Sequence, residues 1–207
     1  RALSISPDGK RVALSAYEQG NLDVWIHDLE RPVKTRLTFD PANEASAQWS
    51  PSGKEIAFYS VRSGESLDIW LQAADGSSEA QPLAKTPLIE IPTSWSRDGS
   101  MLFFSRINPK TGYDIWYIQR KPDGSWQEPV AFLQSEFNEM NGQISRDGRF
   151  VVCTSDQTGR IEIFVRSFPE GGYWQVSAQG GEQPRWSRDG REILYVENRD
   201  TLVSVPV

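Results

Sequence analysis

Short apolar runs separated by polar turns extend along the whole chain and predict strands. In the second quarter of the sequence four strands are expected, at Ala47–Ser50, Glu55–Ser60, Leu67–Gln72 and Ala80–Ala84, with Ser-Gly and Asp-Gly turns between them. Other expected strands, such as Met101–Phe104 and Ile193–Val196, are apolar at every position. A strand with one face in water alternates apolar and polar residues, so these strands predict sheets that are covered on both faces.

A five-residue turn motif divides the chain into similar units. It reads Ser-Pro-Asp-Gly-Lys at residues 6–10 and recurs, with changes, at residues 50–54, 96–100, 145–149 and 187–191. Its glycines lie 44, 46, 49 and 42 residues apart. A second motif follows the first four glycines by fourteen or fifteen residues: Asp23-Val24-Trp25, Asp68-Ile69-Trp70, Asp114-Ile115-Trp116 and, more loosely, Glu162-Ile163-Phe164. Two motifs in phase over four periods establish an internal repeat.

A period in the forties with four strands per unit is typical of a β-propeller, in which each blade is sandwiched between its neighbours. We therefore predict an all-β chain of four-stranded antiparallel blades, with four complete blades and a three-stranded fifth in a single domain, residues 1–207. The expected blades are approximately residues 2–39, 44–84, 91–133, 140–177 and 183–207. The Trp and Phe residues of the repeated motifs are expected to pack between blades.

The fifth unit supplies only three strands, and the chain opens with Arg1 rather than Met. We interpret the chain as a fragment and expect at least one further blade, which makes a ring of six or more. The unpaired blade edges of such a fragment would favour self-association.

Composition and charge limit both the secondary structure and the partners expected for this chain. Sixteen Gly, thirteen Pro and eight Trp favour short strands and turns over helices. The net charge of −6 argues against nucleic acid, because affinity for phosphates depends on Lys and Arg. No apolar run is long enough to span a membrane, so no direct membrane contact is expected. The single cysteine, Cys153, lies in an apolar run and is expected to be a small buried hydrophobe.

A catalytic set is not found. Hydrolysis by a Ser-His-Asp or Cys-His set needs an imidazole base, and the only histidine, His27, lies in an expected strand. No Gly-x-Ser-x-Gly motif is present in the sequence. Zinc sites of Cys and His are excluded by the same count, and no nucleotide-binding loop or EF-hand loop is present. We expect no catalytic or cofactor-binding residues in this chain.

Four glutamates recur close to the start of the expected innermost strands. Glu44, Glu90 and Glu139 stand nine residues before a turn glycine, and Glu182 stands eight before Gly190. In a propeller these positions lie by the mouth of the central channel, where converging carboxylates would raise one another's pKa unless a cation compensates. We hypothesise an acidic rim that accepts Ca²⁺ or a partner bearing Lys or Arg. The alternative is that these are soluble loop residues copied with the repeat.

The aspartate of the second motif also repeats, at Asp23, Asp68 and Asp114. It stands next to the core residues of a strand. We expect it to cap a turn or to accept backbone hydrogen bonds rather than to form a metal ladder.

The segments "SISPDGKRVALS", "WSPSGKEIAFYS" and "RWSRDGREILYV" resemble the TolB-type propeller repeat, a relative of the WD-type repeat, and the likeness covers the whole chain. The segments "LTFDPANEASAQWSPSGKEIAFYSVRSGESLDIW", "FLQSEFNEMNGQISRDGRF" and "SFPEGGYWQVSAQGGEQPRWSRDGREILYV" resemble the C-terminal propeller of bacterial membrane-bound serine/threonine protein kinases. This second resemblance implies a sensory domain in the periplasm or outside the cytoplasm. No kinase catalytic motif is present in this chain, and the resemblance transfers no binding residue.

Three functional hypotheses follow. The first is a non-catalytic module of a larger bacterial envelope protein that binds a protein or peptide partner through loops on one face. The second is the propeller of a prolyl-oligopeptidase-like hydrolase, which requires a separate catalytic domain. The third is a calcium-stabilised scaffold with no partner of its own.

Overall fold

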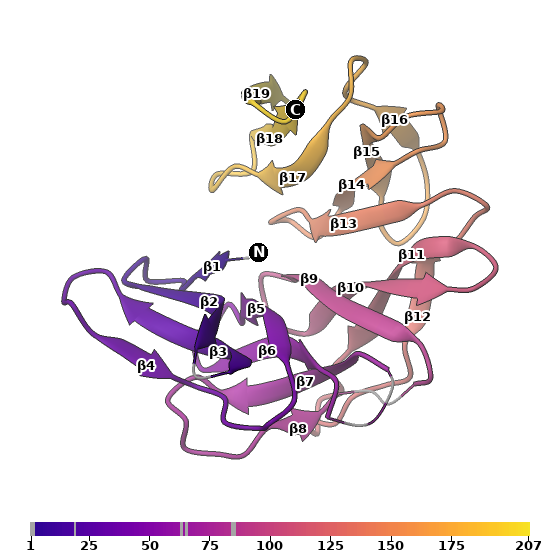
Figure 1. Cartoon of the computed structure of the whole chain (residues 1–207). Coiled ribbons are helices and arrows are strands. Elements are labelled where there is room, and N and C mark those ends of the chain that lie inside the picture. The colour runs from indigo at the N-terminus through magenta and orange to yellow at the C-terminus, as the bar shows by residue number, and fades with distance from the viewer. Residues whose placement is uncertain (1–2, 19, 63, 65, 84–85) are drawn as a thin grey trace.

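Five antiparallel sheets form the whole of the described structure, a computed structural model that covers residues 3–18, 20–62, 64, 66–83 and 86–207. Four sheets have four strands and one has three, so the predicted all-β propeller with a three-stranded fifth blade is confirmed. Figure 1 shows the sheets placed one after another around a common centre. The described residues contain no helix, and hence none that could cross a membrane.

Each blade is a meander in which strands pair in chain order. The first blade comprises β1 (Leu3–Ile5), β2 (Arg11–Glu18), β3 (Asn21–Asp28) and β4 (Lys34–Arg36). The second comprises β5 (Glu44–Trp49), β6 (Glu55–Ser60), β7 (Asp68–Ala73) and β8 (Gln81–Pro82). The third comprises β9 (Ile89–Trp95), β10 (Met101–Asn108), β11 (Gly112–Gln119) and β12 (Val130–Leu133). The fourth comprises β13 (Glu139–Ile144), β14 (Phe150–Ser155), β15 (Glu162–Ser167) and β16 (Tyr173–Gln175). The fifth comprises β17 (Glu182–Trp186), β18 (Glu192–Glu197) and β19 (Thr201–Pro206).

Strand limits differ modestly from those expected. The strand Glu55–Ser60 is found as predicted, whereas the innermost strand of the second blade begins at Glu44 instead of Ala47. The outer strand of that blade is only Gln81–Pro82. The expected limits at Ala2 and Ala84 lie outside the described residues.

The repeated motif forms the turn between the first two strands of each blade. In the fourth blade the Ser145 hydroxyl donates to Asp147 at 2.7 Å, and the Phe150 amide donates to the Ser145 oxygen at 2.9 Å. The bonds to Ser145 and Arg149 lower the pKa of Asp147 to about 2. Gly148 adopts a φ of 74°, which only glycine tolerates readily. The residue types that recur in the motif are thus explained by the local geometry of the turn.

Substituting Gly148 with alanine is expected to lower the free energy of unfolding by about 1 kcal/mol, the cost of the left-handed backbone for a residue with a Cβ. A Cβ at this position meets no atom within 4 Å, so backbone strain is the only cost. Thermal unfolding would measure it as a fall of roughly 2–4 °C. Gly148→Asn is the control and should lose less, because asparagine tolerates this conformation; equal losses would contradict the explanation.

The hydrophobic core lies between blades, in four clusters that each join two consecutive sheets. Phe103 packs against the fourth blade, while Leu102 and Phe104 pack against the second. This placement explains why β10 is apolar on both faces. Trp49 and Trp70 are buried in the cluster between the first two blades, as predicted for the repeated aromatic residues. Cys153 is fully buried in the cluster between the third and fourth, and burial raises its thiol pKa to about 12.

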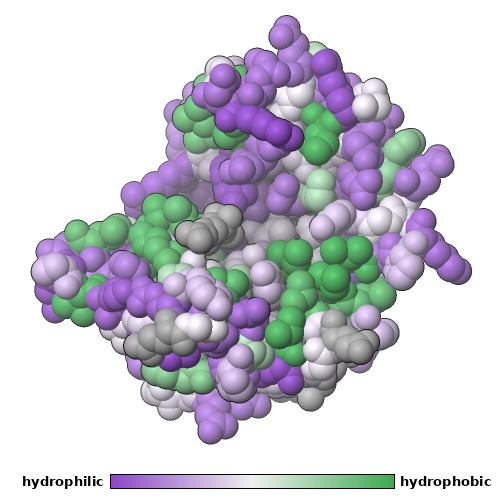
Figure 2. Space-filling model, in the orientation of Figure 1, coloured by the Kyte–Doolittle hydropathy of each residue, from purple (hydrophilic) through white to green (hydrophobic). Residues whose placement is uncertain are grey.

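The two terminal blades differ from the inner three. Leu3 and Ile5 on β1 are 61% and 56% exposed, whereas the equivalent strand β5 is largely buried. Leu202 on β19 is 73% exposed. None of the four core clusters of described residues joins the fifth blade to the first, and Figures 1 and 2 show an opening between these two parts. A further blade stays a prediction.

Candidate functional site

The four repeated glutamates lie at the start of the innermost strands. Glu44, Glu139 and Glu182 begin β5, β13 and β17, and Glu90 is the second residue of β9. Glu44 and Glu90 are fully buried, Glu139 is 3% exposed, and Glu182 is partly exposed. Three of the four carboxylates are therefore internal groups, each at a junction between two blades.

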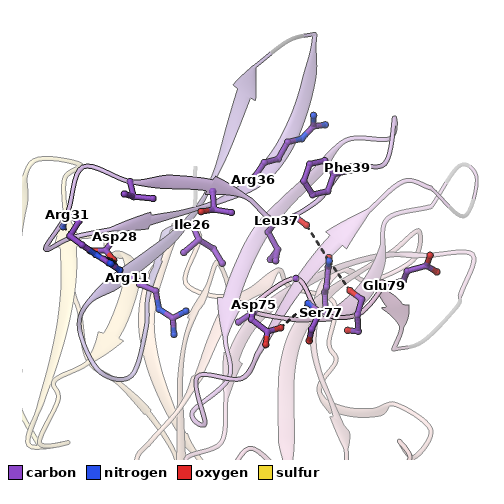
Figure 3. Close-up of a pocket in the computed structure, with 16 residues that line it drawn as sticks. Arg11, Ile26, Asp28, Arg31, Arg36, Leu37, Phe39, Asp75, Ser77 and Glu79 are labelled. Atoms are coloured by element: carbon purple, nitrogen blue, oxygen red, sulfur yellow. Dashed lines mark hydrogen bonds and ion pairs between the residues drawn. The ribbon is translucent and has the colours of Figure 1, made fainter.

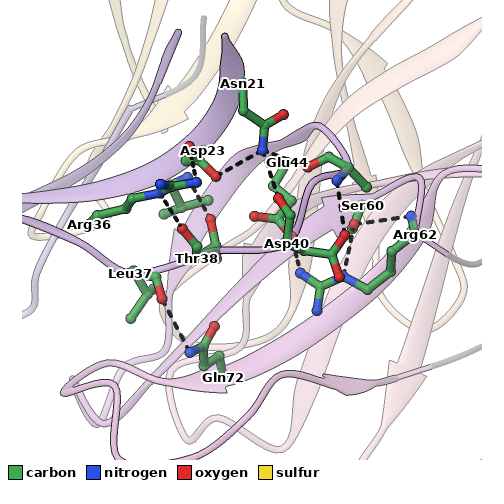
Figure 4. Close-up of polar contacts among 12 residues, drawn as sticks. Asn21, Asp23, Arg36, Leu37, Thr38, Asp40, Glu44, Ser60, Arg62 and Gln72 are labelled. Carbon is green, nitrogen blue, oxygen red and sulfur yellow. Dashed lines mark hydrogen bonds and ion pairs between the residues drawn. The ribbon is translucent and has the colours of Figure 1, made fainter. Parts of the chain in front are cut away.

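At the junction of the first two blades, Glu44 contacts the guanidinium of Arg62 (Figure 4). Arg62 also lies 3.6 Å from Asp40 and stacks over the ring of Trp70 at 4.6 Å. On the first blade, Asp23 pairs with Arg36 at 2.8 Å. Each buried carboxylate in this network therefore has its own cation, as buried charges require.

The next junction repeats this arrangement. Glu90 stands directly opposite Arg106 in the β9–β10 pairing and accepts two hydrogen bonds from it, at 2.5 and 3.0 Å. The Thr86 hydroxyl donates a third at 3.2 Å. Arg106 stacks over Trp116 at 3.9 Å. Burial raises the pKa of Glu90 although the bonds and charge of Arg106 oppose this shift, so desolvation is the larger effect.

The junction of the third and fourth blades lacks the arginine. Glu139 accepts a hydrogen bond from Ser135 at 2.5 Å, and its Oε2 atom has no partner. No ion pair among the described residues involves Glu139. Burial raises the pKa of this carboxyl, and the charges of Asp114 and Asp156 raise it further. Asp114 is itself fully buried, with an unpartnered Oδ1 atom.

Burial removes three of the four glutamates of the hypothesised acidic rim from contact with solvent. Glu44 and Glu90 serve as internal partners of arginines, while Glu182 lies 3.7 Å from Arg199 and is more open. In the part of the chain that the structure describes, no group of three or more His, Cys, Asp or Glu side chains is arranged to hold a metal ion. A role in binding Ca²⁺ or a basic partner stays a prediction.

The aspartates of the second motif lie in the same junctions. Asp23, Asp68 and Asp114 are buried, and each is held by neighbouring polar groups. Asp68 accepts a bond from the Thr86 amide at 3.3 Å. Asp114 accepts bonds from Thr111 at 2.8 Å and Gln134 at 3.0 Å. The expected backbone hydrogen bond is found at Asp68, whereas Asp23 and Asp114 accept bonds from side chains instead.

The innermost strands also carry bulges that the sequence did not indicate. Pairing shifts register at residues 45–48, 140–143 and 182–185. Ser46, Asn141 and Gln183 there adopt φ values of 56°, 58° and 55°. Asn141 and Gln183 line a hollow of about 610 Å³ towards the centre, together with Leu3. These residues are not glycines, so composition offered no signal for the left-handed backbone.

A groove of about 570 Å³ runs between the first blade and the β7–β8 turn of the second (Figure 3). Its apolar lining includes Ile26, Leu37 and Ala74, which are buried in the core between the two blades. Arg11, Arg31, Arg36, Asp75 and Glu79 supply charges of both signs around them.

Phe39 lines the same groove and is 71% exposed, with Arg36 stacked 5.0 Å from its ring centre. Gln72 connects the two walls, because its amide donates to the Leu37 carbonyl at 3.3 Å and the Ser78 carbonyl at 3.2 Å. β4 is the outer strand of its sheet and pairs with β3 on one side only. The groove thus combines an exposed aromatic, an apolar lining, mixed charges and an unpaired strand edge.

Four four-stranded blades and a three-stranded fifth, arranged around one centre, define a β-propeller. The TolB beta propeller domain matches residues 1–110, more than half of the chain, and the chain therefore belongs to that family. An uncharacterized protein of Agrobacterium fabrum is 26% identical over 191 residues, which are 92% of this chain and 52% of that protein. The Tol-Pal system protein TolB of Anaeromyxobacter dehalogenans is 30% identical over 93 residues, 43% of this chain and 20% of that protein.

Among solved structures, a putative TolB from Agrobacterium tumefaciens superposes with a TM-score of 0.80 at 21% identity, covering 97% of this chain and 70% of the other. Propellers of peptidases and of an oligogalacturonate lyase share the fold at lower identity. The chain spans about half the length of the Agrobacterium fabrum relative and a fifth of the Anaeromyxobacter TolB.

Proposed function

We propose that this chain is a non-catalytic protein-interaction module of a larger bacterial envelope protein, and that partners bind in the groove between the first two blades. The exposed ring of Phe39 above an apolar groove is the observation that carries this proposal. Aromatic side chains in such positions are typical anchors of protein interfaces, surrounded by polar groups that fix orientation. The free edge of β4 offers backbone groups to an extended peptide.

The parent protein, in this proposal, is a membrane-bound serine/threonine kinase whose propeller is its sensor outside the cytoplasm. Support comes from the resemblance of segments such as "FLQSEFNEMNGQISRDGRF" to kinase-linked propellers. The family relative named Tol-Pal system protein TolB belongs to a system named for more than one protein, which fits an interaction role. Sequencing the parent gene tests the kinase context: a kinase domain and a membrane span upstream are expected.

A peptidase propeller is the second candidate, because peptidases are among the proteins that share this fold. It requires an α/β-hydrolase domain with a nucleophile elbow in the parent protein. Finding that domain instead of a kinase would replace the proposed context.

Replacing Phe39 with serine in the full parent protein is expected to weaken partner binding by about tenfold or more, since an interface anchor contributes about 2 kcal/mol. Photo-crosslinking from position 39 in the native envelope would identify the partner, and its affinity for the parent and the variant would then be measured. Val130→Ser is the matched control, because Val130 is also an exposed apolar side chain, 45% exposed, on another blade.

Both variants should unfold at the temperature of the unmodified protein, because the two side chains are exposed. Equal binding by Phe39→Ser and the unmodified protein would remove the groove as the binding surface. Equal loss in both variants would point to a nonspecific apolar effect.

A further inference from the structure

Neighbouring turns of the repeated motif lie side by side in three of the four steps along the chain. A Cβ built on Gly53 would meet Pro7 of the preceding turn at 3.6 Å, and one built on Gly99 would meet Pro51 at 3.8 Å. A Cβ on Gly190 would likewise meet Arg146 at 3.8 Å. In these three steps the residue between Ser and Asp in one turn faces the glycine of the next, whereas a Cβ on Gly148 would meet no atom of the turn that contains Arg97 within 4 Å. The row of turns follows the inner ends of the blades on one face of the propeller.

The character of that facing residue changes along the row. It is proline in the first two turns and arginine in the last three, at Arg97, Arg146 and Arg188. All three arginines are exposed. Among the described residues, none of the ion pairs involves any of them. The Arg146 guanidinium donates instead to the Arg188 carbonyl at 2.7 Å, which links two neighbouring turns.

The aspartates of these turns are already engaged. Asp98 and Asp189 accept bonds from their serine hydroxyls at 2.6 and 2.7 Å and from backbone amides. Asp147 does the same and pairs with Arg149 at 2.7 Å. Their Oδ1 atoms bond within the turns, and none of the three aspartates pairs with Arg97, Arg146 or Arg188, so these arginines remain available to an external anion.

A hollow of about 500 Å³ adjoins the row between the fourth and fifth blades. Arg97, Arg146 and Arg149 line it, together with the apolar groups of Phe150 and Trp186. Trp186 is fixed in place because its indole donates to the Gln143 carbonyl at 2.8 Å. Asp147 and Asp189 also line the hollow, but Asp147 is paired with Arg149, so the arginines outnumber the unpaired carboxylates. Together with the two aromatic side chains, this lining suits a ligand that carries acidic groups beside an apolar one.

We propose that Arg97, Arg146 and Arg188 form a docking surface for an acidic peptide segment of a protein partner, with one apolar side chain of that segment in the adjoining hollow. The last three turns carry five arginines and three aspartates, whereas the whole chain has a net charge of −6. An extended polyanion such as nucleic acid or an anionic membrane would meet the negative remainder of the surface. A short acidic segment is confined to the positive part. This surface is separate from the groove at Phe39, and it does not depend on the function proposed there.

The test uses the parent protein and a fluorescein-labelled peptide of glutamates around a central phenylalanine, followed by anisotropy at low and at physiological salt. Arg97→Gln/Arg146→Gln/Arg188→Gln is expected to weaken binding by about tenfold, from three exposed ion pairs of about 0.5 kcal/mol each. Higher salt should weaken binding to the unmodified protein more than to the variant. A second variant, Arg97→Pro/Arg146→Pro, uses the residue that the repeat itself places in the first two turns and should also weaken binding.

The control Lys110→Gln/Lys121→Gln/Arg199→Gln removes three exposed cations outside the row and outside the groove at Phe39, and should bind as the unmodified protein does. The same peptide with lysine in place of glutamate should not bind. Equal losses in the arginine variant and the control would overturn the proposal, as would absence of binding to the unmodified protein. Stronger, arginine-dependent binding of an oligothymidylate or of phosphatidylglycerol vesicles would overturn the assignment to a peptide.

Discussion

Replacing Arg106 with methionine is expected to lower the free energy of unfolding by about 3 kcal/mol, because the change leaves the Glu90 carboxylate buried without a cation. Arg106 is 7% exposed and Glu90 is fully buried, so water cannot take the place of the guanidinium. Methionine retains most of the volume that packs against Trp116. Thermal unfolding should show a fall of roughly 6–12 °C, at about 2–4 °C per kcal/mol.

The double variant Glu90→Gln/Arg106→Met is the control. A neutral amide removes the stranded charge and can still accept the Thr86 bond, so the double variant should recover most of the loss. If both variants lose the same stability, packing of Arg106 rather than its charge is responsible.

The stability lost by the Arg106→Met variant should also increase with pH. The folded-state pKa of Glu90 is raised, so the folded state holds this proton more tightly than the unfolded state does. The cost of the carboxylate therefore appears as pH rises through the folded pKa and is absent below the unfolded pKa, about 4.3. Removing Arg106 raises the folded pKa further. The stability difference between Arg106→Met and the unmodified protein should be larger at pH 7 than at pH 5.

Sequence alone predicted the repeat, the turns and the propeller because these features follow from local physical rules. The Ser145 turn contains its own hydrogen-bond donors and acceptors and a glycine for the positive φ. The apolar run at Met101–Phe104 indicates a strand that is covered on both faces, and Phe103 and Phe104 lie on opposite faces of it. No knowledge of distant contacts was needed for either.

The burial of the glutamates depends on contacts that spacing alone does not reveal. Glu44 and Glu90 are neutralised by arginines 18 and 16 residues later, and this pairing exists only once the first two strands of a blade are in register. A comparison of units offered one usable signal. Arg62 stands nine residues after Gly53, and Gln157 stands nine residues after Gly148. The fourth unit therefore lacks an arginine at the position from which Arg62 pairs with Glu44. The groove was missed because Phe39 belongs to neither repeated motif.

Glu139→Gln is expected to have the opposite effect to Glu90→Gln, although the two glutamates hold equivalent positions in the repeat. Glu90→Gln leaves the Arg106 guanidinium buried without its anion and should destabilise the fold. Glu139 has no such cation among the described residues, and Asp114 adds a second buried negative charge nearby. Replacing its carboxylate with a neutral amide removes that repulsion. An increase of about 1 kcal/mol in the free energy of unfolding at pH 7 is expected.

The hydrogen bonds at Glu139 also favour an increase in stability on substitution to glutamine. The Ser135 hydroxyl donates to Glu139 Oε1 at 2.5 Å, and an amide oxygen accepts this bond equally well. The amide nitrogen replaces Oε2, which has no partner, and brings a donor to a junction where Asp114 Oδ1 is also unpartnered. Substitution to glutamine therefore loses no bond and offers a new one, whereas at Glu90 it weakens two charge-assisted bonds from Arg106.

The dependence on pH distinguishes this explanation from a simple packing effect. Burial and the neighbouring carboxylates raise the folded pKa of Glu139, so its ionisation costs stability as pH rises through that value. Below the unfolded pKa of about 4.3 the carboxyl is neutral in both states, and the two proteins should be equally stable to within the effect of the new bond. Unfolding measured from pH 4 to pH 8 should thus show the advantage of Glu139→Gln increasing with pH. An advantage that is constant over this range would indicate a packing or hydrogen-bond effect instead of ionisation. A loss like that of Glu90→Gln would mean that a cation occupies the junction in solution.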